Sequence, residues 1–92
     1  MLNIIDDLDI LEKFKDNGEL SLNDISKYFK EATYGTNYLK CNDKVFYHQL
    51  YDDKYYIQDG LKSIEINKED FINTINQKIS NYLDLYEVSL DR

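Results

Sequence analysis

Apolar residues near the start of the chain recur at helical spacing. Steps of three and four residues place them on one stripe of a helix over residues 4–16, namely Ile4, Leu8, Leu11 and Phe14. Asp16-Asn17-Gly18 follows, and Gly18 suits the left-handed conformation that closes many helices. The pattern predicts an amphipathic first helix that ends at about Gly18.

A second helix is predicted to begin at Ser21 and to end at Gly35. Ser21 can accept a hydrogen bond from the backbone of Asp24, and the Asp24 carboxylate can return one, as in a capping box. Leu20 and Ile25 occupy the two positions of a hydrophobic staple. The expected buried stripe consists of Leu22, Ile25, Phe29 and Ala32.

The period changes after Gly35. Residues 37–41 form a short extended piece, and strands are expected over residues 44–51, 54–58 and 61–66, with Asp59-Gly60 as a type I′ turn. Alternation assigns one face to the core, with Phe46, Leu50, Tyr55, Ile57, Ile64 and Ile66. The opposite face then carries Val45, Tyr47, Tyr51, Tyr56 and Glu65.

A final helix is predicted from the cap Asn67, with Asp70 as its box partner, to about residue 87. Its apolar stripe consists of Ile72, Ile75, Ile79, Tyr82, Leu83 and Tyr86. The element order α-α-β-β-β-α predicts a small single α+β domain over residues 1–92. We expect a three-stranded antiparallel sheet packed against the helices.

The charge balance limits the classes of partner. Eleven basic and 18 acidic residues give a formal charge of -7, which disfavours binding to nucleic acid or an anionic membrane and favours basic proteins. The segment after Ser21 resembles the first helix of a helix-turn-helix, but Thr33–Leu39, in the place of the recognition helix, contains no basic residue. A short acidic N-terminus without a long apolar run predicts a cytoplasmic protein.

Residues that could support catalysis are sparse. His48 is the only histidine and Cys41 the only cysteine, so no zinc-ligand spacing exists. Strand alternation places His48 on the core face, where a structural role is expected. Asp52 and Asp53, with Asp43 or Asp59, do not have calcium-loop spacing and are interpreted as a solvated hairpin tip. We therefore expect no enzyme activity, no metal and no cofactor.

Two surface features remain as candidate sites. The first is an acidic surface that begins on the first helix and can extend over later carboxylates. It comprises Asp6, Asp7, Asp9, Glu12, Asp16, Glu19, Asp24, Glu31, Asp52, Asp53 and Asp59. The second is an outward-facing aromatic patch that can join two copies into a homodimer, and it comprises Val45, Tyr47, Tyr51 and Tyr56.

The small size, net acidity, aromatic content and acidic runs Asp6-Asp7-Leu8-Asp9 and Asp52-Asp53 resemble phage-encoded DNA-mimic proteins. The chain is most similar to the Arn family of anti-restriction nuclease proteins of T-even bacteriophages. That resemblance implies a dimeric inhibitor, acting in the host cytoplasm, of a modified-cytosine-dependent restriction nuclease. A histone-like nucleoid protein is a further implied target.

Two other functions are compatible with the same residues. An immunity protein that neutralises one cognate nuclease toxin would need similar acidity. A non-mimic interaction module would instead use the tyrosine patch.

Overall fold

The computed structural model describes residues 3–33 and 35–90, with the side chains of residues 32, 33 and 86–90 left undescribed. Within these residues the first element is a single 3-10 turn and the last is a long helix. The elements are η1 Ile4–Asp6, α1 Leu8–Asn17, α2 Leu22–Ser26, β1 Lys30–Thr33, β2 Thr36–Cys41, β3 Lys44–Gln49, β4 Lys54–Asp59, β5 Lys62–Ile66 and α3 Lys68–Leu90.

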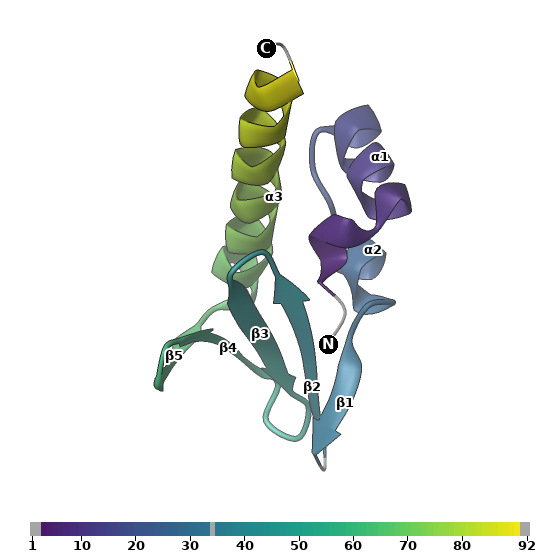
Figure 1. Cartoon of the computed structure of the whole chain (residues 1–92). Helices are drawn as coiled ribbons and strands as arrows, with labels where there is room; N and C mark the ends of the chain where they lie inside the picture. The colour runs from purple at the N-terminus through teal and green to yellow at the C-terminus, as the bar shows by residue number, and fades with distance from the viewer. Residues whose placement is uncertain (1–2, 34, 91–92) are drawn as a thin grey trace.

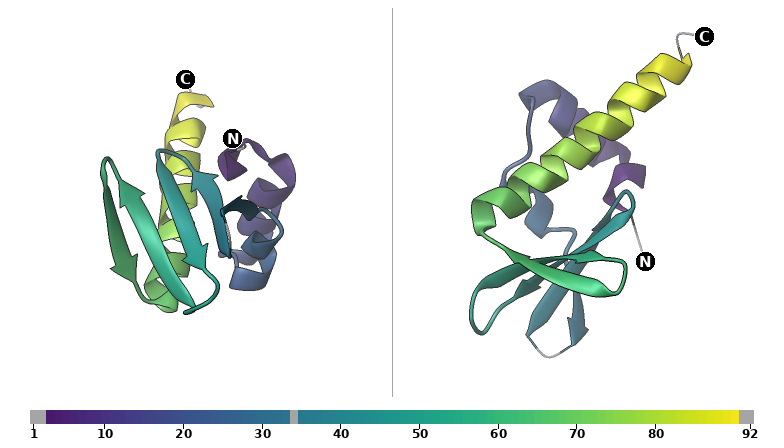
Figure 2. Two further views of the ribbon diagram at one scale, coloured as in Figure 1. Left: turned by 90° about the horizontal axis from the view of Figure 1, so that it is seen from below. Right: turned by 90° about the vertical axis from the view of Figure 1, so that its left-hand side faces the viewer.

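The five strands form one antiparallel sheet in the order β1-β2-β3-β4-β5. Each strand is paired with its neighbour in sequence, so no connection crosses the sheet. The helices lie on one face, with α3 across the sheet and α1 and α2 beside it (Figures 1 and 2). The predicted α+β class with helices against an antiparallel sheet is confirmed, but the sheet has five strands, not three.

The N-terminal helix differs from its prediction. A break at Asp7 separates η1 from α1, because the Asp7 backbone is extended and its side chain caps α1 by accepting from the Asp9 N–H at 2.9 Å. This break changes the phase of the buried stripe. Ile5 and Ile10 are buried, whereas Leu8, expected in the core, is 74% exposed.

The second helix is much shorter than predicted. The capping box of Ser21 and Asp24 forms as expected, but α2 ends at Ser26 and residues 30–33 pair with β2. Gly35, with φ +67°, lies in the turn of this hairpin and does not end a helix. The spacing of the apolar residues after Ser26 fitted a helix. These residues form a strand because they pair with β2, and local periodicity contains no information about such a partner.

The turn between β4 and β5 also differs. Asp59 pairs with Lys62, which leaves Gly60 and Leu61 as a two-residue turn. Gly60 has φ +64° at the first turn position, the placement that a type II′ turn requires, and Asp59 remains in the strand. A type I′ turn needs positive φ at both central residues, and here Gly60 has it but Leu61 does not. The predicted type I′ turn at Asp59-Gly60 was therefore wrong.

The core lies between the sheet and the helices. Phe46 from β3 and Phe71 from α3 are fully buried, and their rings meet edge to face at 5.5 Å. Asn76 of α3 clamps the linker between α1 and α2. Its Oδ1 accepts from the Leu20 N–H at 2.7 Å, and its Nδ2 donates to the Leu20 carbonyl at 2.9 Å. These contacts fix α1 and α2 against α3.

Within the described part of the chain, no helix is both long enough and apolar enough to cross a bilayer.

Candidate functional site

The outward side of α1 carries a stripe of carboxylates. At 3.6 residues per turn, Asp9, Glu12 and Asp16 fall within about 60° of one another around the helix axis. All three are exposed. In the described part of the chain, no side-chain hydrogen bond or ion pair engages them. We call these three residues the α1 stripe.

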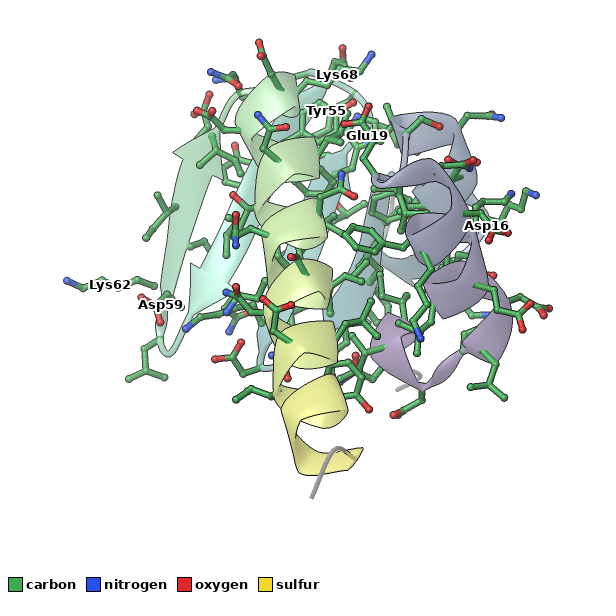
Figure 3. All side chains as sticks on the ribbon, turned by 90° about the horizontal axis from the view of Figure 1, so that it is seen from above. Asp16, Glu19, Tyr55, Asp59, Lys62 and Lys68 are labelled. Atoms are coloured by element: carbon green, nitrogen blue, oxygen red, sulfur yellow. The ribbon has the colours of Figure 1, made fainter. Side chains whose placement is uncertain are left out.

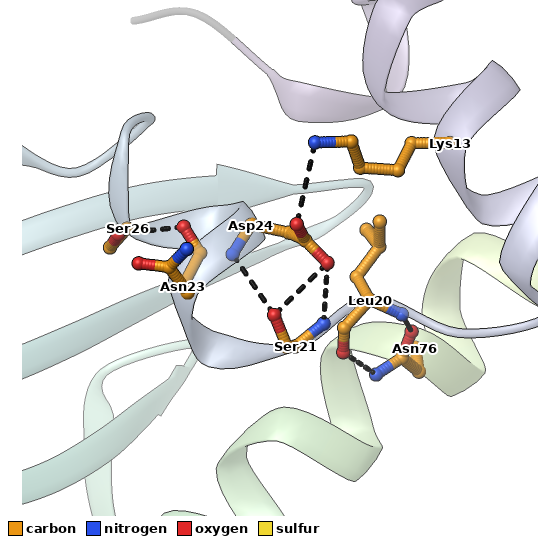
Figure 4. Close-up of polar contacts among 7 residues, drawn as sticks. All are labelled: Lys13, Leu20, Ser21, Asn23, Asp24, Ser26 and Asn76. Atoms are coloured by element: carbon orange, nitrogen blue, oxygen red, sulfur yellow. Dashed lines mark hydrogen bonds and ion pairs between the residues drawn. The ribbon is translucent and has the colours of Figure 1, made fainter.

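Lys13, one helical turn after Asp9, contacts a carboxylate of another helix. Lys13 Nζ lies 3.4 Å from Asp24 Oδ1 of α2, on the side of α1 that faces the capping box (Figure 4). Asp24 accepts from the Ser21 N–H at 2.9 Å, and this bond, with the Ser21 hydroxyl and Lys13, lowers the pKa of Asp24. Asp24 is thus engaged in hydrogen bonds and an ion pair within the fold. Lys13 pairs with Asp24 and not with the carboxylates of the α1 stripe.

The other predicted acids do not form one surface with the stripe. Asp7 caps α1, and its charge adds to desolvation in raising the pKa of Tyr28. Asp59 lies at the β4–β5 turn, on the opposite side of the molecule from Asp16 (Figure 3), and pairs with Lys44 at 2.6 Å.

The remaining predicted acids are dispersed over several elements. Asp52 and Asp53 occupy the β3–β4 turn, at the other end of β4 from Asp59. Asp53 contacts the His48 ring at 2.7 Å. Glu31 is on the edge strand β1, whereas Asp6 and Glu19 lie near the two ends of α1 and are exposed. The candidate acidic site is therefore the α1 stripe with Asp6, which lines a cleft together with Glu12, whereas Glu19 lies on the side that faces α3, beside Asn73 and Gln77.

An open cleft lies beside the stripe, between α1 and α3. Its volume is about 420 Å³, and it is lined by Ile5, Asp6, Leu8, Leu11, Glu12, Lys15, Tyr82 and Leu83. Leu8, exposed by the break at Asp7, lies at this cleft. Apolar surface and carboxylates therefore adjoin each other, which sequence periodicity missed because it assigned Leu8 to the core.

The face of the sheet opposite the helices carries a row of tyrosines. Tyr38 pairs with Tyr47, and Tyr47 pairs with Tyr56, so the three rings follow one another across β2, β3 and β4. Lys30 of β1 and Glu65 of β5 complete the row at its two ends. In Figure 2, left, the sheet lies in front of the helices and presents this face to the viewer. We call it the open face.

The tyrosine patch predicted from the sequence is only partly on the open face. Val45, Tyr47 and Tyr56 are on it, by their pairing and alternation with buried Phe46 and Tyr55. Tyr51 is in the β3–β4 turn and is 79% exposed, because β3 ends at Gln49. Tyr38 was missed, although the extended piece over residues 37–41 could have revealed it.

The open face is hollowed next to two of the tyrosines. The hollow has a volume of about 250 Å³ and is lined by Thr36, Tyr47, Gln49, Tyr56, Gln58 and Ser63. The Tyr47 hydroxyl donates to Gln58 Oε1 at 2.6 Å, which fixes both side chains. Tyr38 is not among the lining residues.

The two residues considered for catalysis lie on the helix-covered side. Cys41 is fully buried, and burial raises the pKa of its thiol to about 12, so the nucleophilic thiolate is disfavoured at neutral pH. The His48 ring stacks on Tyr55 with centroids 4.2 Å apart, as the predicted structural role requires.

In residues 3–33 and 35–90, no group of three or more His, Cys, Asp or Glu side chains is arranged to hold a metal ion. Comparison with protein-family models, curated proteins and solved structures found no match to this chain.

Proposed function

We propose that the protein is a non-enzymatic acidic inhibitor that occupies the DNA-binding surface of a basic host protein, in the manner of the DNA-mimic family it resembles. A restriction nuclease and a histone-like nucleoid protein are the target classes. The observation that supports this is the α1 stripe, in which Asp9, Glu12 and Asp16 share one exposed side of a helix while Lys13 is held by Asp24.

The mechanism is competition for cations. Side chains one helical turn apart have Cβ atoms about 5–6 Å from each other. Lysine and arginine side chains that normally contact phosphates can therefore reach successive carboxylates of the stripe. Exposed charges are screened within about 8 Å at physiological salt, so affinity should fall as ionic strength rises. The adjoining cleft, with exposed Leu8, offers the partner an apolar contact that salt does not weaken.

The test measures displacement of labelled duplex DNA from a purified histone-like nucleoid protein at several salt concentrations. The wild-type protein should displace the DNA at low salt and progressively less at high salt. The triple variant Asp9→Lys, Glu12→Lys, Asp16→Lys should fail to displace it while keeping its circular dichroism spectrum. Normal displacement by this variant would exclude the α1 stripe as the site.

A matched control separates the stripe from net charge. Asp52, Glu69 and Asp84 are exposed carboxylates on other elements, and their replacement by lysine changes the net charge by the same amount. This second triple variant should retain displacement. Equal loss in both triple variants would mean that total charge, and not the stripe, governs the effect.

The same assay distinguishes a mimic from an immunity protein. A mimic of the DNA backbone should compete on several unrelated DNA-binding proteins, because it presents charges that they all recognise. An immunity protein should act on one nuclease alone. A panel of three purified proteins, a nucleoid protein, a restriction nuclease and a repressor, separates the two outcomes.

A further inference from the structure

We propose that two copies of this chain associate through their open faces, about a two-fold axis that lies between the two faces, runs parallel to the strands and passes over β3. The proposal is independent of the inhibitory function, since it uses the side of the sheet away from the helices. It follows from the order of charged, aromatic and polar residues in the three cross-strand rows of the face.

The central row is self-complementary. From β1 to β5 it reads Lys30, Tyr38, Tyr47, Tyr56 and Glu65. The proposed axis reverses the order of the strands in the second copy. Lys30 of each copy then faces Glu65 of the other, Tyr38 faces Tyr56, and Tyr47 meets its own equivalent. Opposite charges close both ends of an aromatic centre.

The flanking rows also avoid contact between like charges. On one side the row Lys40, Val45, Gln58 and Ser63 places Lys40 opposite Gln58 and Val45 opposite its equivalent. On the other side Thr36, Gln49 and Lys54 place Lys54 opposite Thr36. Lys54 Nζ also lies 3.8 Å from Glu65 Oε1 of its own chain, so in the dimer Glu65 has a cation on both sides. A two-fold axis across the strands would instead bring Lys30 against Lys30 and Glu65 against Glu65. Charge therefore selects the axis along the strands.

The shape of the face agrees with the same axis. The hollow of about 250 Å³ lies off centre, with both Tyr47 and Tyr56 among its lining residues. Tyr38 lies on the other side of Tyr47 and does not line it. The axis places Tyr38 of each copy opposite Tyr56 of the other, at the edge of the hollow, so the proposal has the Tyr38 ring enter that recess. Packed sheets commonly align their strands to within about 30°, which this arrangement allows.

The area sets the expected strength. Five strands about 4.8 Å apart and roughly 20 Å long give a face about 24 Å wide with an area of about 480 Å². This is smaller than the roughly 800 Å² per partner of a standard interface. We therefore expect a dissociation constant in the micromolar range. The glutamate at the end of the row and the net charge of -7 disfavour a single-stranded nucleic acid as the occupant of the same rings.

The test is a charge swap followed by sedimentation equilibrium over a concentration series. Lys30→Glu alone and Glu65→Lys alone each create two like-charge contacts per dimer, and each should weaken association roughly tenfold. Glu65→Lys also removes the 3.8 Å pair with Lys54 of the same chain, so its circular dichroism spectrum and free energy of unfolding are compared with those of the wild type. The double variant Lys30→Glu, Glu65→Lys restores opposite charges and should return most of the affinity. Tyr38→Ala, which removes the ring expected to fill the hollow, should weaken association at least as much as either single reversal.

Matched controls and a competing ligand complete the design. Lys62→Glu and Glu69→Lys change net charge by the same amounts at exposed positions off the central row and should leave association unchanged. A protein that remains monomeric to millimolar concentration would overturn the proposal, and so would a double variant no better than the weaker single variant. Binding of oligo(dT) that Lys30→Glu weakens and Glu65→Lys strengthens, without self-association, would assign the face to nucleic acid instead.

Discussion

The two faces of the sheet are built from alternate residues of the same strands but differ in burial. On β3, Phe46 is fully buried under α3 while its neighbours Val45 and Tyr47 remain partly exposed on the open face. On β4, Tyr55 is buried and Tyr56 is not. Residue type does not separate the faces, because both carry aromatic rings. The difference is that only one face has helices packed against it.

From this difference in burial we expect the covered face to determine stability and the open face to determine association. Buried rings on the covered face lose all contact with water and contact one another, as Tyr55 and Phe71 do at 4.8 Å. Rings on the open face are half-buried and keep part of their apolar surface in solvent, so the hydrophobic free energy of that part is available to a partner. Substitutions on the covered face should therefore change the free energy of unfolding, and substitutions on the open face should change association.

The largest expected effect comes from Phe46→Ala, compared with Tyr47→Ala on the next position of β3. Loss of the fully buried ring should lower the free energy of unfolding by about 3–5 kcal/mol. Loss of the open-face ring should cost about 1 kcal/mol or less. Urea denaturation at a concentration where the chain is monomeric measures both, and similar losses would contradict the assigned faces.

The next effect concerns Asn76, which joins α3 to the α1–α2 linker on the covered side. Asn76→Ala leaves both polar groups of Leu20 without their partner and should lower the free energy of unfolding by about 1–3 kcal/mol. Asn73→Ala, on an exposed position one turn earlier, is the control. Because alanine is the better helix former, this control should be neutral or slightly stabilising. Equal losses in the two variants would show that the clamp contributes little.

Local signals in the sequence identified several features of this fold correctly. Gly18 has the expected left-handed backbone, with φ +79°, and the Ser21–Asp24 capping box is present. Each of these depends on residues within one turn of the chain. Alternation along β3 and β4 likewise separated buried Phe46 and Tyr55 from Tyr47 and Tyr56.

Features that depend on distant partners were not predicted. β1 requires pairing with β2, and the Asn76 clamp joins residues 56 positions apart. The acidic surface was predicted as a run of carboxylates, but which of them remain available depends on Lys13 reaching Asp24 and Lys44 reaching Asp59. Tyr38 belongs to the tyrosine row because β2 pairs with β3, which brings Tyr38 beside Tyr47. Sequence spacing contains no information on these long-range neighbours.

A smaller effect is expected at the start of α2, where the capping box holds the helix beside the covered face. Ser21→Ala removes the hydroxyl that accepts from the Asp24 N–H at 3.2 Å and should lower the free energy of unfolding by about 1 kcal/mol. Ser26→Ala is the control, since among the described residues that hydroxyl donates to the Asn23 carbonyl within its own turn and to no other group. Thermal unfolding of both variants tests the difference, and an unchanged midpoint for Ser21→Ala would contradict it.

The smallest effect is the acid sensitivity of an ion pair that ties the sheet to the helix layer. Lys78 of α3 donates to Asp43 at 2.5 Å, and this hydrogen bond lowers the pKa of Asp43 below its ordinary value of 3.8. A lowered folded-state pKa contributes stability that is complete above the ordinary value and is lost as pH falls through the folded value. Because the Asp43 side chain is 62% exposed, the contribution should be only about 0.2–1 kcal/mol.

Comparison of Asp43→Asn with the wild-type protein isolates this contribution. Asparagine keeps the turn chemistry of the β2–β3 hairpin but removes the charge, so the variant should be less stable at pH 7 and equally stable well below pH 3.8. Asp52→Asn removes a carboxylate that has no ion pair among the described residues, and its stability should follow the wild-type curve. Urea denaturation from pH 7 to pH 2 measures all three proteins. If the gap between Asp43→Asn and wild type persisted at pH 2, where the Asp43 carboxyl is protonated, the lost stability would not come from the charge on Asp43, and the ion pair with Lys78 would not be its source.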